Sequence, residues 1–219
     1  MLNIEIGGHQ NKKEEYMNID NFINRIVLNI KDKNIRNLVS SALKEADEQF
    51  FYAAASSSGK YHPPEDNGEH GLLRHTIKVM YIAGQLATYF DIPGDMKDAV
   101  VGAAIVHDIR KNGHRWKDKT DYRHGILGFE YIMSFRDTYS FQVTEMMLAR
   151  CIRFHMYRFS KPKIEADLAV KCDDIEVKIV QLADFIASRK QASFLPGIEL
   201  EANKIDDYLN GDKYVCSEL

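Results

Sequence analysis

Four histidines and one aspartate lie on predicted helix faces that are otherwise apolar. The residues at helical spacing from His75 are Val79, Ile82 and Leu86, and Asp184 has equally apolar neighbours. A single inward histidine is most often hydrogen-bonded to the backbone, but an ionised carboxylate on an apolar face costs several kcal/mol unless something neutralises it. Several such groups on different helices predict a metal centre. The candidate ligands are His75, His107, Asp108, His124, His155 and Asp184.

The mixture of imidazole nitrogen and carboxylate oxygen indicates which ions this centre would take. Such ligands suit Mn, Fe, Co, Ni or Zn better than Ca, which prefers oxygen ligands, and Mg is a further candidate. Six candidate ligands exceed what one tetrahedral ion can use. The sequence therefore predicts two divalent metal ions as cofactors.

The elements that would position these ligands are helical throughout. Apolar residues recur at spacings of three and four, and breakers such as SKPK at 160–163 and FLPG at 194–197 separate the segments. Strand signals are scarce apart from a brief alternation at Leu2, Ile4 and Ile6. The fold class is therefore predicted to be all-α. The predicted helices cover 18–31, 34–54, 70–90, 95–109, 123–136, 140–157, 173–189 and 197–209.

The chain offers no long polar stretch that could serve as a linker between domains. We expect residues 1–17 to form a polar lead-in and residues 18–219 to form one helical domain. The loop at 56–68, rich in serine, proline and glycine, is the expected rim element. One domain is therefore the predicted organisation.

The charge and composition of the chain exclude several classes of protein. A net charge of -3 at pH 7 provides no general attraction to nucleic acid or anionic lipid, so duplex DNA is not an expected partner. The apolar block AVVGAAIV at 99–106 is far shorter than the roughly 20 residues that span a bilayer. The N-terminus has no signal-peptide pattern, and the three cysteines lack zinc-finger spacing. We expect a soluble, cytoplasmic protein with no membrane partner.

The order of the candidate ligands resembles that of the HD-domain superfamily of metal-dependent phosphohydrolases. HDIRK at 107–111 is similar to the HDxxK form of its doublet, and RHGILGFEYI at 123–132 is similar to a helix start in its two-metal members. The resemblance covers about residues 50–190. It implies an all-α helical bundle, the HD domain, as the fold.

The segment that leads to His75 is most similar to one group within that superfamily. Residues 50–79 resemble the HD domains of bacterial 3'-5' exoribonucleases, although His70 and Arg74 replace the Gly and Glu of their GGLLEHT motif. The segment after His155 reads HMYRFSKPK and lacks the GYP motif of cyclic-dinucleotide esterases. The resemblance therefore favours the first group over the second.

The same resemblance implies how the ligands are shared between two ions. Asp108 would bridge the ions and take part in catalysis. Lys111, one turn beyond His107, would bind phosphate or assist the leaving group, and its alternative is an exposed lysine at a helix end. The implied ligands are His75, His107 and Asp184 for the first ion and His124 and His155 for the second.

An enzyme is the leading hypothesis for function. It would hydrolyse a phosphate ester bond of a nucleotide or short single-stranded oligonucleotide through a metal-activated water. The alternatives are a 3'-5' single-strand nuclease, a non-catalytic nucleotide sensor that holds metal, and a helical scaffold without metal. A second copy of the chain is a further candidate partner, because the helices expected over 18–31 and 34–54 are rich in apolar residues. The candidate substrate contacts are His70, Arg74, Arg123, Arg153 and Arg158.

Overall fold

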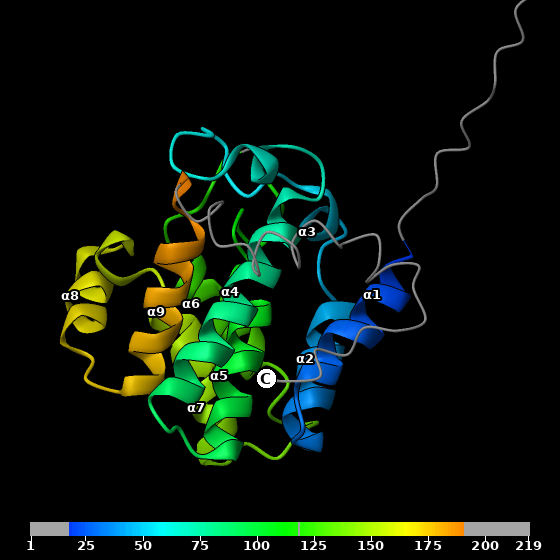
Figure 1. Ribbon diagram of the computed structural model, residues 1–219, viewed down its shortest axis with the longest axis vertical. Helices are drawn as coiled ribbons and strands as arrows, with labels where there is room; N and C mark the ends of the chain where they lie inside the picture. The colour runs from blue at the N-terminus through cyan, green and yellow to red at the C-terminus, as the bar shows by residue number, and fades with distance from the viewer. Residues whose placement is uncertain (1–17, 118, 191–219) are drawn as a thin grey trace, which may run out of the picture.

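The structure is a computed structural model that describes residues 18–117 and 119–190 (Figure 1). Within these residues the chain is helical and contains no strand, which confirms the predicted all-α class. Short 3-10 turns, η1 (Val27–Asn29), η2 (Pro64–Asn67) and η3 (Tyr157–Phe159), lie between the α-helices. The α-helices are α1 (Ile19–Ile26), α2 (Lys33–Lys44), α3 (Gln49–Tyr52), α4 (Gly71–Tyr89), α5 (Gly94–Val106), α6 (His124–Met133), α7 (Val143–Phe154), α8 (Lys163–Lys171) and α9 (Ile175–Ala187).

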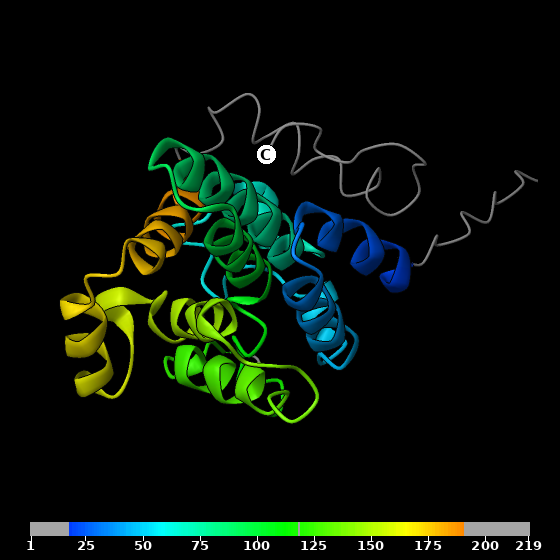
Figure 2. The ribbon, with the colours of Figure 1, turned by 90° about the horizontal axis from the view of Figure 1, so that it is seen from below.

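Helices α4 and α5 form the centre of the bundle (Figure 1 and Figure 2). Helix α9 packs along α4, α7 packs along α5, and α6 packs on α7. Helix α2 packs against α5 from the other side, next to α1, and α8 lies at the outer edge, where it contacts α7 and η3. The five helices that carry or adjoin candidate ligands therefore pack as one connected group.

Helix α5 is built from small residues because it has neighbours on several sides. A methyl group added at Gly102 would lie 2.9 Å from Leu148 of α7 and 3.1 Å from Ile35 of α2. Ala103 and Ala104 are fully buried beside it. Small side chains let helix axes approach closely, so α5 can hold both partners near the point where it ends.

Polar side chains define where several helices begin. Asn18 caps α1 by accepting from the Asn21 backbone N–H at 2.9 Å, and Asp32 caps α2 in the same way. Gln142 and Glu145 form a reciprocal capping box at the start of α7. These contacts satisfy backbone N–H groups that have no partner within the helix.

Most predicted helices are present, with ends that differ by a few residues. The helix expected over 34–54 is divided into α2 and α3, because residues 45–48 leave the helical conformation. None of the described helices is long and apolar enough to cross a membrane. The predicted helices that match α4, α5, α6, α7 and α9 are 70–90, 95–109, 123–136, 140–157 and 173–189.

Helix α8 is not among the predicted helices. The proline-containing segment at 160–163 indicates a break, and a break does occur there, but a new helix follows it directly. Pro162 occupies the N-cap position of α8, where a missing backbone N–H removes no helical hydrogen bond. The helix expected over 197–209, the alternation at residues 2–6 and the lead-in at 1–17 lie outside the described residues.

Candidate metal centre

The doublet of His107 and Asp108 lies at the C-terminal end of α5. The side chain of His107 is fully buried, and that of Asp108 is 3% exposed. The last carbonyls of a helix have no donor within the helix, so the Ala104 carbonyl can accept a hydrogen bond from His107 Nδ1, at 2.7 Å. The helix end thus places an imidazole and a carboxylate side by side in the interior.

The same contact between imidazole and carbonyl recurs at two other candidate ligands. His124 Nδ1 lies 2.7 Å from the Asp121 carbonyl oxygen, and His155 Nδ1 lies 2.7 Å from that of Ile152. A neutral imidazole has one N–H, and a carbonyl can only accept, so the proton is assigned to Nδ1 from these contacts. In their neutral forms, His107, His124 and His155 therefore each present an Nε2 lone pair.

The carboxylate of Asp108 lies between two pairs of histidines. Its Oδ1 is 2.9 Å from His124 Nε2 and 3.7 Å from His155 Nε2. Its Oδ2 is 3.4 Å from His107 Nε2 and 3.9 Å from His75 Nε2. Each oxygen therefore faces a different pair of imidazole nitrogens.

Asp184 reaches the centre from α9. Its Oδ1 lies 3.1 Å from His75 Nε2 and 3.9 Å from His107 Nε2. Its side chain is 26% exposed, which is the highest value among the six candidate ligands. The structure therefore brings all six predicted residues together, with Asp184 at the edge nearest to solvent.

The unsatisfied atoms of this cluster fit a metal centre. Among the described residues, neither ring nitrogen of His75 has a hydrogen-bond partner, and His107 Nε2 has none either. The Nε2 atoms of His124 and His155 lie 3.0 Å apart, although both are lone-pair atoms when Nδ1 carries the proton. Two lone pairs at this distance repel each other unless a cation or a proton lies between them. Two sets of potential ligands are close enough to hold an ion. Within each set the ligand atoms lie within 4.8 Å of one another, and the sets are His75, His107 and Asp108, and Asp108, His124 and His155.

Burial and neighbouring charges set the protonation of this cluster. Burial alone would raise the pKa of Asp108, but Lys111 and His107 outweigh it and hold that pKa well below its usual range. Burial opposes ionisation of Asp184 as well, yet the adjacent His75 imidazole, 3.1 Å away, keeps the pKa of Asp184 low. Burial lowers the pKa of His75 to about 4. At neutral pH the carboxylates are charged and His75 is neutral, which are the forms that bind metal ions.

Lys111 contacts the centre directly. Its Nζ donates to Asp108 Oδ2 at 2.5 Å, and its side chain is 11% exposed. The backbone N–H of Lys111 also bonds to the Asp108 carbonyl, in the turn that follows α5. The lysine is therefore held beside the doublet and does not extend freely into solvent.

Two of the predicted substrate contacts, His70 and Arg74, lie at the start of α4 and bond to backbone carbonyls of α3 and of the preceding loop. His70 precedes α4 with a positive φ of 57°, and its Nδ1 lies 2.7 Å from the Phe51 carbonyl oxygen. Arg74 donates to the carbonyls of Glu65 and Glu69, at 3.2 and 2.7 Å. A substrate contact at either residue stays a prediction.

The other three predicted contacts are arginines with different surroundings. Arg123 pairs with Asp121 at 2.8 Å and its side chain is 57% exposed. Arg153 forms two hydrogen bonds to Glu165 of α8, at 2.8 and 3.0 Å. Arg158 is exposed at the surface. Asp121 and Glu165 each hold the guanidinium of one arginine with two hydrogen bonds, and the Arg153 side chain is the less exposed of these two, at 32% against 57% for Arg123.

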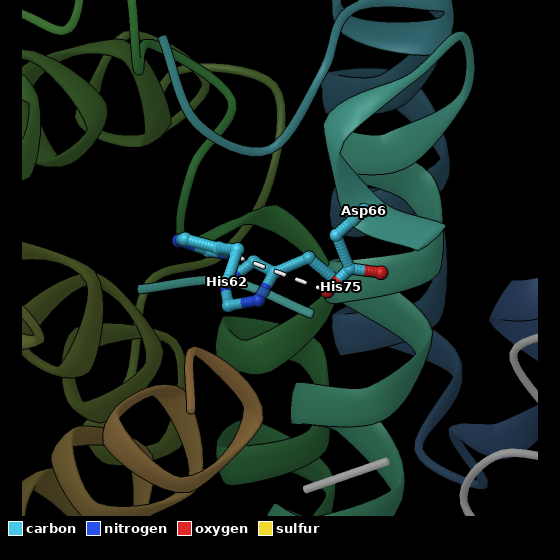
Figure 3. A group of neighbouring side chains, drawn as sticks. All are labelled: His62, Asp66 and His75. Atoms are coloured by element: carbon cyan, nitrogen blue, oxygen red, sulfur yellow. Dashed lines mark ion pairs between the residues drawn. The ribbon is translucent and has the colours of Figure 1, made fainter. Parts of the chain in front are cut away.

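A third group of potential ligands lies next to His75 (Figure 3). His62 Nδ1 is 3.9 Å from Asp66 Oδ2, and the ring of His62 is 4.9 Å from that of His75. Asp66 is fully buried and accepts from Lys78 Nζ at 3.0 Å. Sequence reasoning assigned no role to Asp66 or Lys78. Two features of the sequence could have indicated these residues, namely the His-x3-Asp spacing in the loop and a lysine within an apolar stretch of α4.

Comparison with known families agrees with this geometry. The model of the HD domain family matches residues 72–188, which is more than half of the chain and spans α4 to α9. The chain therefore belongs to the HD domain family, whose members are in general hydrolases that bind divalent metals. Searches of curated proteins and of solved structures found no match. The expected resemblance to the superfamily is thus confirmed, whereas the one to exoribonuclease HD domains has no support from these comparisons.

Proposed function

We propose that this protein is a dinuclear metal-dependent phosphohydrolase that cleaves a phosphate ester bond of a nucleotide or a short single-stranded oligonucleotide. The observation that carries the proposal is the position of Asp108 between two pairs of histidines. A carboxylate with one oxygen toward each pair is suited to bridge two ions, and two-metal sites of this kind serve phosphoryl chemistry. Asp108 is therefore the residue on which the proposal depends most.

The donor set divides into two halves around that carboxylate. Nitrogen and oxygen donors of this kind suit Mn, Fe, Co, Ni or Zn, and Mg is a further candidate. When bound, two such ions supply a water that loses its proton near neutral pH, and they also supply positive charge next to the phosphoryl oxygens. We assign His75, His107 and Asp184 to the first ion, His124 and His155 to the second, and Asp108 to both.

Lys111 has two functions in this proposal. Its ammonium keeps Asp108 ionised, because it lowers the pKa of that carboxyl and donates to Oδ2. An ammonium has three N–H donors, and Asp108 occupies one in the hydrogen bonds of the described residues. The remaining donors are placed to hold a phosphoryl oxygen or to protonate a leaving oxygen. We therefore assign Lys111 a catalytic role beside the bridging carboxylate.

The substrate is expected to approach from the edge of the centre where Asp184 lies, because the side chain of Asp184 is partly exposed. Arg123 adjoins His124 in the chain and has an exposed side chain, so it is the leading candidate among the arginines for a phosphate contact.

A 3'-5' single-strand nuclease is the second candidate function. It rests on the resemblance that the sequence of residues 50–79 suggests to HD domains of the exoribonuclease type, which the comparisons do not support.

The decisive experiment compares substrates and variants in parallel. Protein stripped of metal is reloaded with Mn²⁺ or Co²⁺ and incubated with nucleoside mono-, di- and triphosphates, cyclic nucleotides and end-labelled short RNA. We expect turnover of a nucleotide, its loss in Asp108→Asn, and normal turnover in Arg136→Gln, which alters an exposed ion pair with Asp137. Stepwise shortening of RNA without nucleotide turnover would favour the nuclease. Binding without turnover under every ion would contradict an enzyme and favour a sensor.

A further inference from the structure

His75 differs from the other three histidines of the centre in the contacts of its Nδ1 atom, the ring nitrogen that is not assigned to a metal ion. The Nδ1 atoms of the other three each contact a backbone carbonyl at the end or the start of a helix, at 2.7 Å. His75 lies inside α4, where the helix's own hydrogen bonds occupy the nearby carbonyls. Its Nδ1 is buried and has no hydrogen-bond partner within residues 18–117 and 119–190. A group outside this helix is therefore needed to satisfy this atom.

Asp66 offers the matching acceptor. Its side chain is fully buried, and its Oδ2 has no hydrogen-bond partner in the part of the chain that the structure describes, whereas its Oδ1 accepts from Lys78 Nζ at 3.0 Å. Ligand atoms of His62, Asp66 and His75 lie within 4.8 Å of one another (Figure 3). Among the described residues the unpartnered Oδ2 has the unpartnered His62 Nδ1 at 3.9 Å, and a ring nitrogen of His75 lies within 4.8 Å of the same buried carboxylate. Leaving such buried groups unpaired is unfavourable.

The backbone around Asp66 fixes the carboxylate in this place. The Asp66 carbonyl accepts from the Ala55 N–H at 2.9 Å. The same carbonyl oxygen lies against Gly71 at the start of α4, where an added methyl group would be only 2.1 Å away. Lys78, one turn after His75 on the same helix, is 1% exposed and also contacts Glu65 at 2.9 Å. The loop is therefore held to α4 on both sides of the carboxylate.

We infer that Asp66 is a positioning residue that accepts a hydrogen bond from His75 Nδ1–H and so directs His75 Nε2 toward the first ion. This inference rests on the metal centre of the proposed function. A carboxylate behind a metal-bound histidine fixes its tautomer and strengthens it as a ligand. Lys78 orients the carboxylate, and His62 packs edge-on against the His75 ring with only 12% of its side chain exposed. The loop at 56–68 would thereby control how tightly the first ion is held.

A third cation among these residues is the competing explanation. His62, Asp66 and His75 are of ligand type, but the Lys78 ammonium already lies 3.0 Å from the Asp66 carboxylate. A metal ion bound to the same carboxylate would place a second positive charge against that ammonium. His75 would also have to bind ions through both ring nitrogens. The hydrogen bond avoids both difficulties, so it is the assignment that the geometry favours.

The test is Asp66→Asn, with Glu65→Gln as matched control. An ammonium can only donate, so the oxygen of the introduced amide would turn to Lys78 and its NH2 group toward His75. His75 Nδ1 would then have to accept, which moves its proton to Nε2 and prevents metal binding there. Glu65→Gln changes the other acidic partner of Lys78 without changing the group next to His75.

Chelator-stripped protein is titrated with Co²⁺ against a competing chelator, and its absorption is recorded. We expect Asp66→Asn to bind one of two ions about 10- to 100-fold more weakly, and Glu65→Gln to bind both within about twofold of the unmodified protein. Equal affinity in all three proteins would overturn the inference. A third ion that binds the unmodified protein and is lost in Asp66→Asn would also overturn it, in favour of a cation site.

A second measurement does not depend on the variant folding. In the unmodified protein loaded with Zn²⁺ and labelled with 15N-histidine, the His75 Nδ1–H should give a downfield proton signal that exchanges slowly with water. A fast-exchanging signal at an ordinary position would contradict the hydrogen bond to Asp66. If the unmodified protein binds no divalent ion, the proposed function itself fails. If it binds two ions but Asp66→Asn binds them equally well, only the present inference fails.

Discussion

Gly125, the residue after His124, is predicted to be essential for the second half of the metal centre. A methyl group at this position would lie 2.5 Å from the Arg153 carbonyl oxygen of α7, two residues before His155. Real Cβ atoms essentially never approach closer than 3.0 Å, so Gly125→Ala must separate α6 from α7 by about 0.5 Å or more. The His124 and His155 Nε2 atoms, now 3.0 Å apart, would separate with them. Metal–ligand distances tolerate only about 0.2 Å.

The expected size of this effect follows from the cost of overpacking. Forcing a methyl group into a packed interface costs about 1–3 kcal/mol. If binding of the second ion must work against that cost, its affinity falls roughly 5- to 160-fold. The better helix propensity of alanine contributes about 1 kcal/mol in the other direction, so the folded state should survive.

The assay is metal content after dialysis against limiting free Mn²⁺, with melting temperature recorded in parallel. We expect two ions in the unmodified protein and one in Gly125→Ala. Gly94→Ala is the control, because its added methyl group meets nothing within 4 Å. If Gly125→Ala retains two ions with unchanged affinity, the close contact between α6 and α7 does not set the geometry of the second ion's ligands.

Three further predictions concern metal removal, Lys111 and pH. An ion whose free concentration is about 100 times its Kd stabilises the folded state by about 2.7 kcal/mol. Removal of the ions by a chelator should therefore lower Tm by about 5–11 °C per ion in calorimetry. An unchanged Tm would contradict a resident metal centre. Lys111→Met, assayed at saturating metal, should lose about 100-fold or more in kcat, and a loss below about threefold would remove Lys111 from catalysis. Burial opposes ionisation of Glu145, but hydrogen bonds from Asn34 and Gln142 outweigh burial and lower the pKa of this carboxyl. The ionised side chain therefore stabilises the fold above about pH 4.3, the pKa of the unfolded state, and this stabilisation is lost as pH falls through the lowered pKa of the folded state. Urea unfolding should therefore show Glu145→Gln about 1 kcal/mol less stable at pH 7 and progressively closer to the unmodified protein below about pH 4.3, and a constant difference would contradict this sign.

The six candidate ligands could be found from the sequence because each is a local anomaly. Asp184 is a carboxylate on a face shared with Val177 and Val180, and the cost of burying it is visible in the helix pattern alone. Their convergence also follows from the sequence, since inward polar groups on packed helices have few places to meet. The structure brings these residues together, whereas their binding of metal stays a prediction.

The role inferred for Asp66 could not be found in the same way. Asp66 lies in a loop with no periodic pattern, and its position depends on contacts with Ala55 and Gly71 that only the folded chain creates. Lys78 stands within an apolar stretch of α4, but the sequence does not show that its ammonium meets Asp66, and it is buried. Helix α8 escaped prediction for a related reason, because a proline both ends one segment and begins the next. Loop conformation and helix starts at proline depend on tertiary context more than helix faces do.

Anomalous diffraction from crystals of the protein loaded with Mn²⁺ tests the central claim most directly. We predict two peaks, one among His75, His107 and Asp184 and the other beside His124 and His155, with a different oxygen of Asp108 directed at each. A single peak, or two peaks with Asp108 in contact with neither, would contradict the dinuclear centre and the hydrolysis proposed for it.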